Sequence, residues 1–375
     1  MDPTTVPDRQ ARLLRLRSQL LDRGGQPELR LAATVRELCG VHAQLPSSSA
    51  LTLRPRTSGT LAGEVERCRV ERRELVRTWC MRGTFHLLAS DDVRWLLELL
   101  APTLLAGGAR RRGQLGLDED TFDRARRIVR RALDEGPLTR PELAARLAAG
   151  GVDPAGQRIA HLVHRFGLEG LVCHGPDRGA EPTFVLLDDW LGPSLARPLD
   201  RDRALAELAR RYLAAYGPAG PPDLAAWSGL GVRDARAAFA AVAGELTEVV
   251  VAGEPAWLPA ARSAWLRDPP PDGPLVHLLP GFDVLLLGYR DRALTVPAAH
   301  ARAVWTGGGF IKPTVCVDGL AVATWSSTTR ARRLEVTVAP FGRLPDPLLP
   351  RLEAEVADLG RFLGQPAALR AVGRA

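Results

Sequence analysis

One order of predicted elements occurs three times along the chain, and this repetition constrains the fold more than any other feature. In the clearest copy, Thr139-Arg-Pro-Glu142 has capping-box spacing with proline in the first turn, which predicts a helix that ends at Gly150-Gly151. The second helix carries apolar residues at the spacing of one buried stripe: Ile159, Leu162, Val163 and Phe166. Two β-rich runs, 171–174 and 183–187, then predict a hairpin. Helix, turn, helix and hairpin is the order of a winged helix.

Two further copies flank this one. Between residues 217 and 259, helices lie on either side of Gly229-Leu-Gly231, and the runs 247–251 and 256–258 predict a hairpin. The earliest copy begins near Leu31, and its hairpin would surround Met81-Arg-Gly83. Its second helix would hold Leu61, Val65 and Cys68. A repeat of this length indicates tandem domains rather than a solenoid.

The chain changes character after residues 268–273, a proline-rich run that we interpret as a linker; 193–203 is a second linker candidate. The following runs are short and β-rich: 275–279, 284–287, 314–317, 320–325 and 334–338. Asp318-Gly319 predicts a tight hairpin, and a helix over 347–363 closes the chain. We interpret this part as a small β-barrel or half-barrel.

These patterns predict an α+β protein of four domains. Winged helix 1 would span 1–116, winged helix 2 would span 117–196, and winged helix 3 would span 197–272. The C-terminal small β-barrel region with its terminal helix would span 273–375. A further helix, from about Gln10 to Leu21, would dock on the surface of this assembly.

The charge balance indicates a polyanionic partner. The chain has 50 Lys and Arg against 43 Asp and Glu, and all but Lys312 of the basic residues are arginine. The planar guanidinium group suits phosphate oxygens. A GC-rich coding sequence would explain the arginine-for-lysine bias equally well.

Several classes are excluded by composition. The five cysteines are scattered and form no Cys-x-x-Cys pair, which argues against a disulfide framework and a zinc ribbon. No apolar run is long enough to span a bilayer, and the N-terminus lacks the apolar core of a secretion signal. We therefore expect a cytoplasmic protein that does not contact a membrane.

The segment 38–46 is the most informative for chemistry. Gly40 should end a helix, and Pro46 forces Leu45 into an extended conformation. In an extended chain, His42 and Gln44 project to the same side and can hold and polarise one water. The alternative is a capped loop that happens to carry two polar residues.

Three further runs carry a family resemblance. They are Arg77-Thr-Trp-Cys-Met-Arg-Gly-Thr-Phe-His86, Leu279-Pro-Gly-Phe-Asp-Val-Leu-Leu-Leu-Gly-Tyr-Arg-Asp-Arg292 and Gly308-Gly-Phe-Ile-Lys-Pro313. Together, and in this order, they resemble the signature runs of bacterial winged-helix DNA glycosylases of the AlkZ/YcaQ type. The resemblance implies three winged helices and a β-barrel that form a C-shaped channel around duplex DNA. It also implies monofunctional, cofactor-free and metal-free hydrolysis of the N-glycosidic bonds of bulky N7-alkylpurines and, in some members, of interstrand crosslinks.

The catalytic element of that family is a Gln, apolar, Gln or Asp tripeptide, and the matching positions here are His42-Ala43-Gln44. The last position fits the family pattern and the first departs from it, so the substrate range does not carry over. Histidine can still accept a proton from water. No lysine lies near the tripeptide to form a Schiff base, which argues against a lyase mechanism.

Candidate DNA contacts lie on three segments. Those flanking the first hairpin are Arg77, Trp79, Arg82 and Thr84. Those in a stretch expected to be flexible after Gly107-Gly108 are Arg110, Arg111 and Arg112. Those on the presumed groove-facing helix are Arg158, His161 and Arg165. The alternatives are core packing for Trp79, an ion pair with Glu74 for Arg77, and a solvated face for the arginine run.

Two other clusters receive structural interpretations. His161, His164, Cys173 and His174 complete no metal motif of known spacing, so we predict no metal site. Asp283 and the Arg290-Asp291-Arg292 cluster are interpreted as structural ion pairs in the β-rich region.

The sequence therefore predicts a glycosylase that acts on double-stranded DNA carrying alkylated purines, in repair or in self-resistance to a genotoxic metabolite. A channel around one lesion needs only a monomer, with no obligate protein partner. One alternative is a non-catalytic winged-helix DNA-binding protein, either a regulator or a protein that sequesters adducts. Another is a housekeeping enzyme for simple alkyl adducts.

Overall fold

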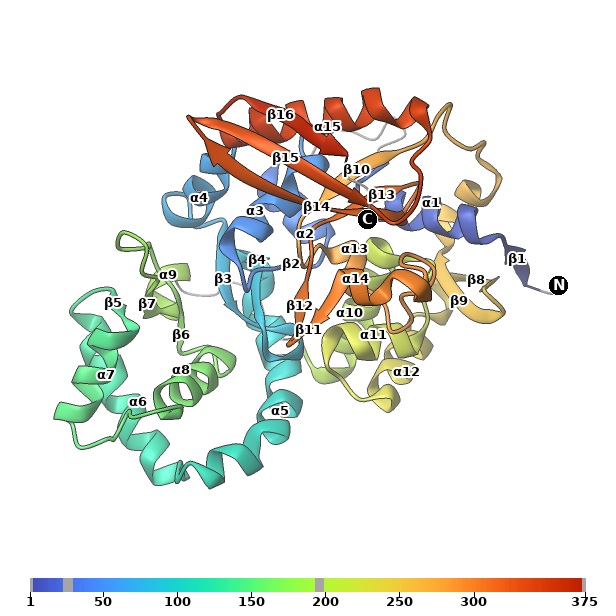
Figure 1. The fold of residues 1–375 in the computed structure, drawn as a ribbon. Coiled ribbons are helices and arrows are strands. Elements are labelled where there is room, and N and C mark those ends of the chain that lie inside the picture. The colour runs from blue at the N-terminus through green and yellow to red at the C-terminus, as the bar shows by residue number, and fades with distance from the viewer. Residues whose placement is uncertain (1–2, 23–29, 193–198, 373–375) are drawn as a thin grey trace.

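The computed structural model describes residues 3–22, 30–192 and 199–372, and its fold is a mixture of helices and sheets (Figure 1). The first unit contains α2 (Leu31–Glu37), β2 (Val41–His42), α3 (Pro46–Leu53), η1 (Arg54–Arg56), α4 (Ala62–Val70), β3 (Leu75–Trp79), η2 (Met81–Gly83), β4 (Phe85–Ala89) and α5 (Ser90–Gln114). The hairpin predicted around Met81–Gly83 and the helix that holds Val65 are confirmed.

The second unit follows α5 and lies at one side of the molecule (Figure 1). It contains α6 (Glu119–Asp134), β5 (Leu138–Thr139), α7 (Arg140–Ala149), α8 (Arg158–Leu168), β6 (Val172–His174), β7 (Thr183–Leu186) and α9 (Leu187–Leu191). The predicted capping box is present: the Glu142 carboxylate accepts from the Thr139 backbone N–H at 2.8 Å, and the Thr139 hydroxyl accepts from the Glu142 backbone N–H. The two orphan N–H groups at the start of α7 are thereby satisfied.

The third unit contains α10 (Arg201–Tyr216), α11 (Pro221–Ser228), α12 (Val232–Ala241), β8 (Leu246–Val251), β9 (Glu254–Pro259) and η4 (Ala260–Arg267). Gly229 ends α11 with φ +88°, a left-handed conformation that favours glycine. The N-terminal segment joins this unit, because β1 (Thr4–Val6) pairs in parallel with β8. The predicted N-terminal helix is α1 (Asp8–Ser18). Of the linker predicted at 193–203, residues 193–198 lie outside the described residues.

The C-terminal part is built on an open sheet. It contains β10 (Val276–Leu279), α13 (Val284–Leu287), η5 (Ala298–His300), α14 (Ala301–Val304), β11 (Trp305–Gly307), β12 (Phe310–Ile311), β13 (Thr314–Val317), β14 (Leu320–Arg330), β15 (Arg333–Pro340), η6 (Asp346–Leu348), α15 (Leu349–Leu363) and β16 (Ala367–Val372). Five of these strands pair in the order β10-β13-β14-β15-β16, so the described strands form a half-barrel and the closed barrel is wrong. The strand predicted at 284–287 is also wrong, because Asp283 caps the short helix α13 there.

The hairpins of the first and second units form one sheet, which the sequence did not predict. Its strand order is β2-β4-β3-β6-β7-β5, and Arg77 on β3 pairs with His174 on β6 where the two units meet. The second unit is therefore fixed to the first by backbone hydrogen bonds as well as by side-chain packing.

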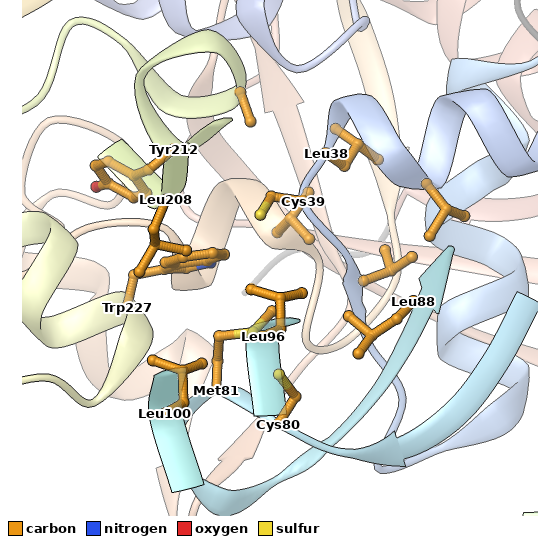
Figure 2. Packing of buried hydrophobic residues seen from close by; sticks show 14 of the residues in the cluster. Leu38, Cys39, Cys80, Met81, Leu88, Leu96, Leu100, Leu208, Tyr212 and Trp227 are labelled. Atoms are coloured by element: carbon orange, nitrogen blue, oxygen red, sulfur yellow. The ribbon is translucent and has the colours of Figure 1, made fainter. Parts of the chain in front are cut away.

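The first and third units share a hydrophobic core. Side chains from the end of α2, from η2 between β3 and β4, and from α5 pack against side chains from α10 and α11: Leu38, Cys39, Met81 and Leu96 against Leu208, Tyr212 and Trp227 (Figure 2). All seven are buried. A continuous apolar core of this kind resists relative motion of the two units. Among the described residues, no helix has both the length and the apolar character needed to cross a membrane.

Two buried arginines attach the C-terminal part to the first unit. The Arg54 guanidinium donates to Glu355, Asp358 and the carbonyl of Leu278. The Arg56 guanidinium makes two parallel hydrogen bonds of 2.9 Å to Asp283, and both side chains are fully buried. This confirms the structural ion pair expected at Asp283, although its partner lies far away in the sequence.

We predict that removing one partner of the Arg56–Asp283 pair strongly destabilises this junction. Arg56→Met should lower the free energy of unfolding by about 3–5 kcal/mol in urea denaturation, because Asp283 is left as a buried, unpaired charge. The double variant Arg56→Met/Asp283→Leu should recover most of that loss. The control Arg9→Met removes the more exposed pair with Asp318 and should cost about 1 kcal/mol or less. A loss for Arg56→Met no larger than for Arg9→Met would contradict the prediction.

Candidate active site

Within the tripeptide His42-Ala43-Gln44, His42 lies on the short strand β2, as predicted, whereas the chain bends at Gln44 rather than continuing extended to Leu45. His42 on β2 pairs with His86 on β4, and the Ala43 N–H donates to the carbonyl of Phe85 at 2.7 Å. The carbonyl of Ala43 accepts from Nε of Arg77 at 3.0 Å. Both backbone groups between the two candidate catalytic side chains are therefore fixed, so the orientation of each side chain is determined largely by its own rotamer.

His42 lies in an aromatic and largely dry environment. Its ring stacks on Phe282 with centroids 4.9 Å apart and planes at 13°, and it meets His86 edge-on at 5.5 Å. Only 7% of His42 is exposed, and its buried Nδ1 has no hydrogen-bond partner among the described residues. Burial lowers the pKa of His42 from 6.5 to about 4, and the charge of Arg82 acts in the same direction. His42 is therefore neutral at pH 7 and can accept a hydrogen bond from water.

Phe282 is brought to His42 by the turn between β10 and α13. Gly281 is required there, because a Cβ at this position would collide with the carbonyl oxygen of Ile311. Phe282 itself has φ +65°, which is uncommon for a residue other than glycine. The next residue, Asp283, is anchored by Arg56 and caps α13. The run that begins at Leu279 thus places one aromatic ring against His42, the candidate catalytic histidine.

Unlike His42, which is buried among aromatic rings, Gln44 is exposed to solvent. It lines a cavity of about 650 Å³ between the first and second units. Trp79, Phe85 and Phe184 contribute aromatic walls to this cavity. His42 is not among the residues that line it. The shared action of His42 and Gln44 on one water therefore stays a prediction.

Arg77 holds the tripeptide by its hydrogen bond to the carbonyl of Ala43. Only 8% of it is exposed, and it makes no ion pair with any described carboxylate. Burial lowers its pKa to about 10, so it remains charged at pH 7. The alternative pairing with Glu74 is wrong, because Glu74 accepts instead from Cys68 and Arg72. Arg77 is hydrogen-bonded to the carbonyl of Ala43 and is one of the residues that line the cavity.

The other residues near the first hairpin have structural contacts. Trp79 is buried in the core of the second unit, as its alternative interpretation held, and a Cβ at Gly167 would collide with its ring. The Arg82 guanidinium donates to the carbonyl of Trp227, which ties the hairpin to α11. The Thr84 hydroxyl donates to the carbonyl of Met81. Their contact with DNA stays a prediction.

The arginines at 110–112 lie on a helix. The flexible stretch expected after Gly107-Gly108 is wrong, because α5 continues to Gln114 and packs against α8. Arg110 is exposed, and Arg111 donates to Gln114 and Gln157. Arg112 is buried, donates to the carbonyl of Leu105 and lines the cavity.

Helix α8 carries the remaining candidates. Arg158 donates to the carbonyls of Asp153 and Leu115. Arg165 makes two hydrogen bonds to Glu119 and one of 2.6 Å to Glu169. His161 lines the cavity, where burial lowers its pKa. Two of the three side chains are thus engaged within the second unit, and their role in DNA binding stays a prediction.

Sequence reasoning missed the aromatic residues around the tripeptide. His86 and Phe282 contact His42, and Phe310 lies 6.5 Å from Phe282. Phe310 is 62% exposed at the end of the turn formed by Gly307-Gly308-Gly309, between β11 and β12. The glycine run was a visible signal for this hairpin, whereas the contact with Phe282 depends on the tertiary fold.

The fold and the site define a protein with a cavity that carries arginines, and among the described residues Arg77 and Arg112 form no ion pair with a carboxylate, which suits a nucleic-acid ligand. Residues 35–362 match the family model described as DNA glycosylase AlkZ-like. The chain is 31% identical to an interstrand DNA cross-link repair glycosylase of Streptomyces sahachiroi, over 95% of this chain and 96% of that protein. The solved structure of Streptomyces sahachiroi DNA glycosylase AlkZ superposes with a TM-score of 0.83 at 29% identity, over 98% of this chain and 100% of that one. The chain belongs to the AlkZ-like DNA glycosylase family and is a hydrolase that acts on N-glycosyl bonds.

We predict that the protonation of His42 does not limit activity near neutral pH. The pKa of His42 is lowered to about 4, so the single-turnover rate constant should stay flat from about pH 8 to about pH 5.5 and fall only at lower pH. The same shift makes the folded state lose stability between about pH 6.5 and pH 4, where only the unfolded chain takes up the proton. The measurement is the rate constant for base release against pH, corrected for spontaneous depurination. A decline centred near pH 6.5 would contradict it.

Proposed function

We propose that this enzyme is monofunctional and hydrolyses the N-glycosidic bond of bulky N7-alkylpurines in duplex DNA. The observation that carries the proposal is the tripeptide His42-Ala43-Gln44, whose backbone is fixed on both sides and whose histidine is kept neutral. Three winged-helix modules, at 1–116, 117–196 and 197–272, and a half-barrel region at 273–375 would form a C-shaped channel for the duplex.

The chemistry needs little basic strength. N7 alkylation makes the purine a cationic and therefore good leaving group, so the sugar carbon becomes strongly electrophilic as the bond breaks. The enzyme must then place a water and orient dipoles toward the developing positive charge. The neutral imidazole of His42 and the amide oxygen of Gln44 supply two such acceptors. No lysine lies in the tripeptide or along the cavity, which favours attack by water over a Schiff base.

The biological role that we propose is based on the similarity to the Streptomyces sahachiroi protein. The Streptomyces sahachiroi protein is named for interstrand cross-link repair. We extend this to a cytoplasmic repair enzyme, acting as a monomer, that confers resistance to a genotoxic metabolite and accepts crosslinks as well as monoadducts. A housekeeping enzyme for simple alkyl adducts has the same chemistry and would differ in its preference for small substituents.

The second candidate is a DNA-binding protein without catalysis. It is favoured by one observation: His42 occupies the position of the family's first glutamine, and most of its ring is covered by Phe282 and His86. Such a protein would bind adducted DNA and leave the glycosidic bond intact.

The test is a single-turnover reaction on a duplex that carries one N7-methylguanine or one bulky N7-alkylguanine. We expect release of the free base at least about a thousandfold faster than spontaneous depurination, with greater acceleration for the bulky adduct. The strand should break only after alkali treatment, since a hydrolase leaves an abasic site. The same duplex with guanine is the control for damage recognition.

Tight binding of either adduct without release of base would overturn the proposal and support the DNA-binding alternative. Faster release of N7-methylguanine than of the bulky base would instead identify a housekeeping enzyme.

A further inference from the structure

The hairpin that joins β14 to β15 ends in a basic and hydroxyl-rich tip. This hairpin tip comprises residues 326–333, with the sequence Ser-Ser-Thr-Thr-Arg-Ala-Arg-Arg. Every residue of the hairpin tip is exposed, whereas the part of β14 before Ser326 alternates between buried and half-buried residues. The arginine and hydroxyl side chains of this short segment are therefore all accessible to a partner.

The turn at the end of the hairpin tip is strained. Arg330 pairs with Arg333, so the turn consists of Ala331 and Arg332, with φ +47° and +62°. A two-residue turn with positive φ at both positions favours Asn-Gly or Asp-Gly, because other residues pay a steric cost there. The hairpin between β13 and β14 meets the same requirement with Asp318-Gly319. The chain thus accepts a cost at the hairpin tip that it avoids one hairpin earlier.

The charges of the hairpin tip are unfavourable as well. Arg330 and Arg333 lie directly opposite each other on adjacent strands, where like charges repel. Among the described residues, Arg332 and Arg333 form no ion pair, and Arg330 comes no closer than 4.0 Å to Glu335. Arg370 binds the Glu335 carboxylate more closely, at 3.0 Å. Proteins accept local costs of this kind mainly at functional sites.

One edge of the hairpin tip has no strand beside it. β13 pairs with β14 only as far as Thr324, so from Ser326 onward β14 pairs with β15 alone among the described strands. Such an edge presents backbone N–H groups to solvent. Arginine, serine and threonine side chains together with backbone N–H groups are the donors that proteins use to contact DNA phosphates. The donor set of the hairpin tip therefore fits a sugar–phosphate backbone.

We infer that the hairpin tip binds the sugar–phosphate backbone of duplex DNA outside the cavity between the first and second units. None of residues 326–333 lines that cavity, so this contact is separate from the surface beside Gln44. Contacts to phosphates carry no sequence information, so undamaged duplex binds the hairpin tip as well as damaged duplex does. The competing explanation is that the arginines only prevent the exposed strand edge from pairing with another chain.

Fluorescence anisotropy with an undamaged duplex of about 30 base pairs tests the inference over a range of salt concentrations. The test variant carries Arg330→Gln, Arg332→Gln and Arg333→Gln together. We expect its dissociation constant to rise at least about tenfold at low salt, and the slope of log K against log salt to fall by about two. The reason is that each lost phosphate contact releases about one counterion fewer on binding.

The matched control removes the same charge from α10. It carries Arg201→Gln, Arg203→Gln and Arg210→Gln, three exposed arginines that each pair with a carboxylate. An equal change in both variants would overturn the inference, because it would show an effect of net charge alone. A test variant that binds like the wild type and self-associates in light scattering would overturn it in favour of edge protection. Absence of duplex binding by the wild type would also overturn it, whereas base release is judged by its own assay.

A single change separates binding from folding. Arg332→Gly supplies the residue that the turn favours, so its melting temperature should equal or exceed that of the wild type. We expect the same variant to bind the duplex about threefold more weakly, because one phosphate contact is lost. A lower melting temperature with unchanged affinity would show a purely structural role for Arg332 and would overturn the inference.

Discussion

The ion pair between Arg56 and Asp283 connects the surroundings of His42 to the rest of the fold. Both side chains are fully buried, and Asp283 directly follows Phe282, whose ring lies on His42. A buried pair of this kind contributes little net stability over apolar residues of the same shape, because desolvation offsets its attraction. The role of the Arg56–Asp283 pair here is to hold neighbouring residues in place. The pair fixes the turn that carries Phe282, and with Arg54 it attaches the half-barrel to η1, which follows the candidate tripeptide and α3.

Apolar packing around His42 has a direct chemical consequence. The difference between a pKa of 6.5 and about 4 corresponds to about 3 kcal/mol against the imidazolium form. With the proposed cationic substrate, the site would keep an uncharged acceptor next to it, where a charged histidine would oppose binding. The lowered pKa makes the His42 imidazole a weaker base. A reaction whose leaving group is already activated does not need a strong base. On the proposed function, the arrangement would therefore suit alkylated purines better than unmodified ones.

Local signals in the sequence predicted much of the fold. The capping box at Thr139, the glycine stop at Gly229 and the hairpin at Asp318-Gly319 each depend on residues close together in the chain. The errors came where local patterns are ambiguous or partners are distant. Four apolar residues at 284–287 fit a strand or a helix equally, and the cap at Asp283 decided for the helix. Arg165 pairs with Glu119 and Glu169, two carboxylates that its helical pattern did not reveal, and its contact with DNA stays a prediction. The stacking of Phe282 on His42 and the joining of two hairpins at Arg77 and His174 arise from the tertiary fold, which no spacing in one sequence reveals.

The central claim is that His42 and Gln44 act together on one water. A double-mutant cycle tests it most directly: His42→Ala, Gln44→Ala and the double variant are compared by single-turnover base release from bulky N7-alkylguanine DNA. His300→Ala is the control, since that histidine stacks on Phe341 and does not contact the tripeptide. The account predicts that each single change slows release by about 10²–10⁴-fold and that the double change is less than about tenfold slower than the worse single variant. Effects of the two changes that multiply independently, or a wild-type rate for His42→Ala, would contradict it.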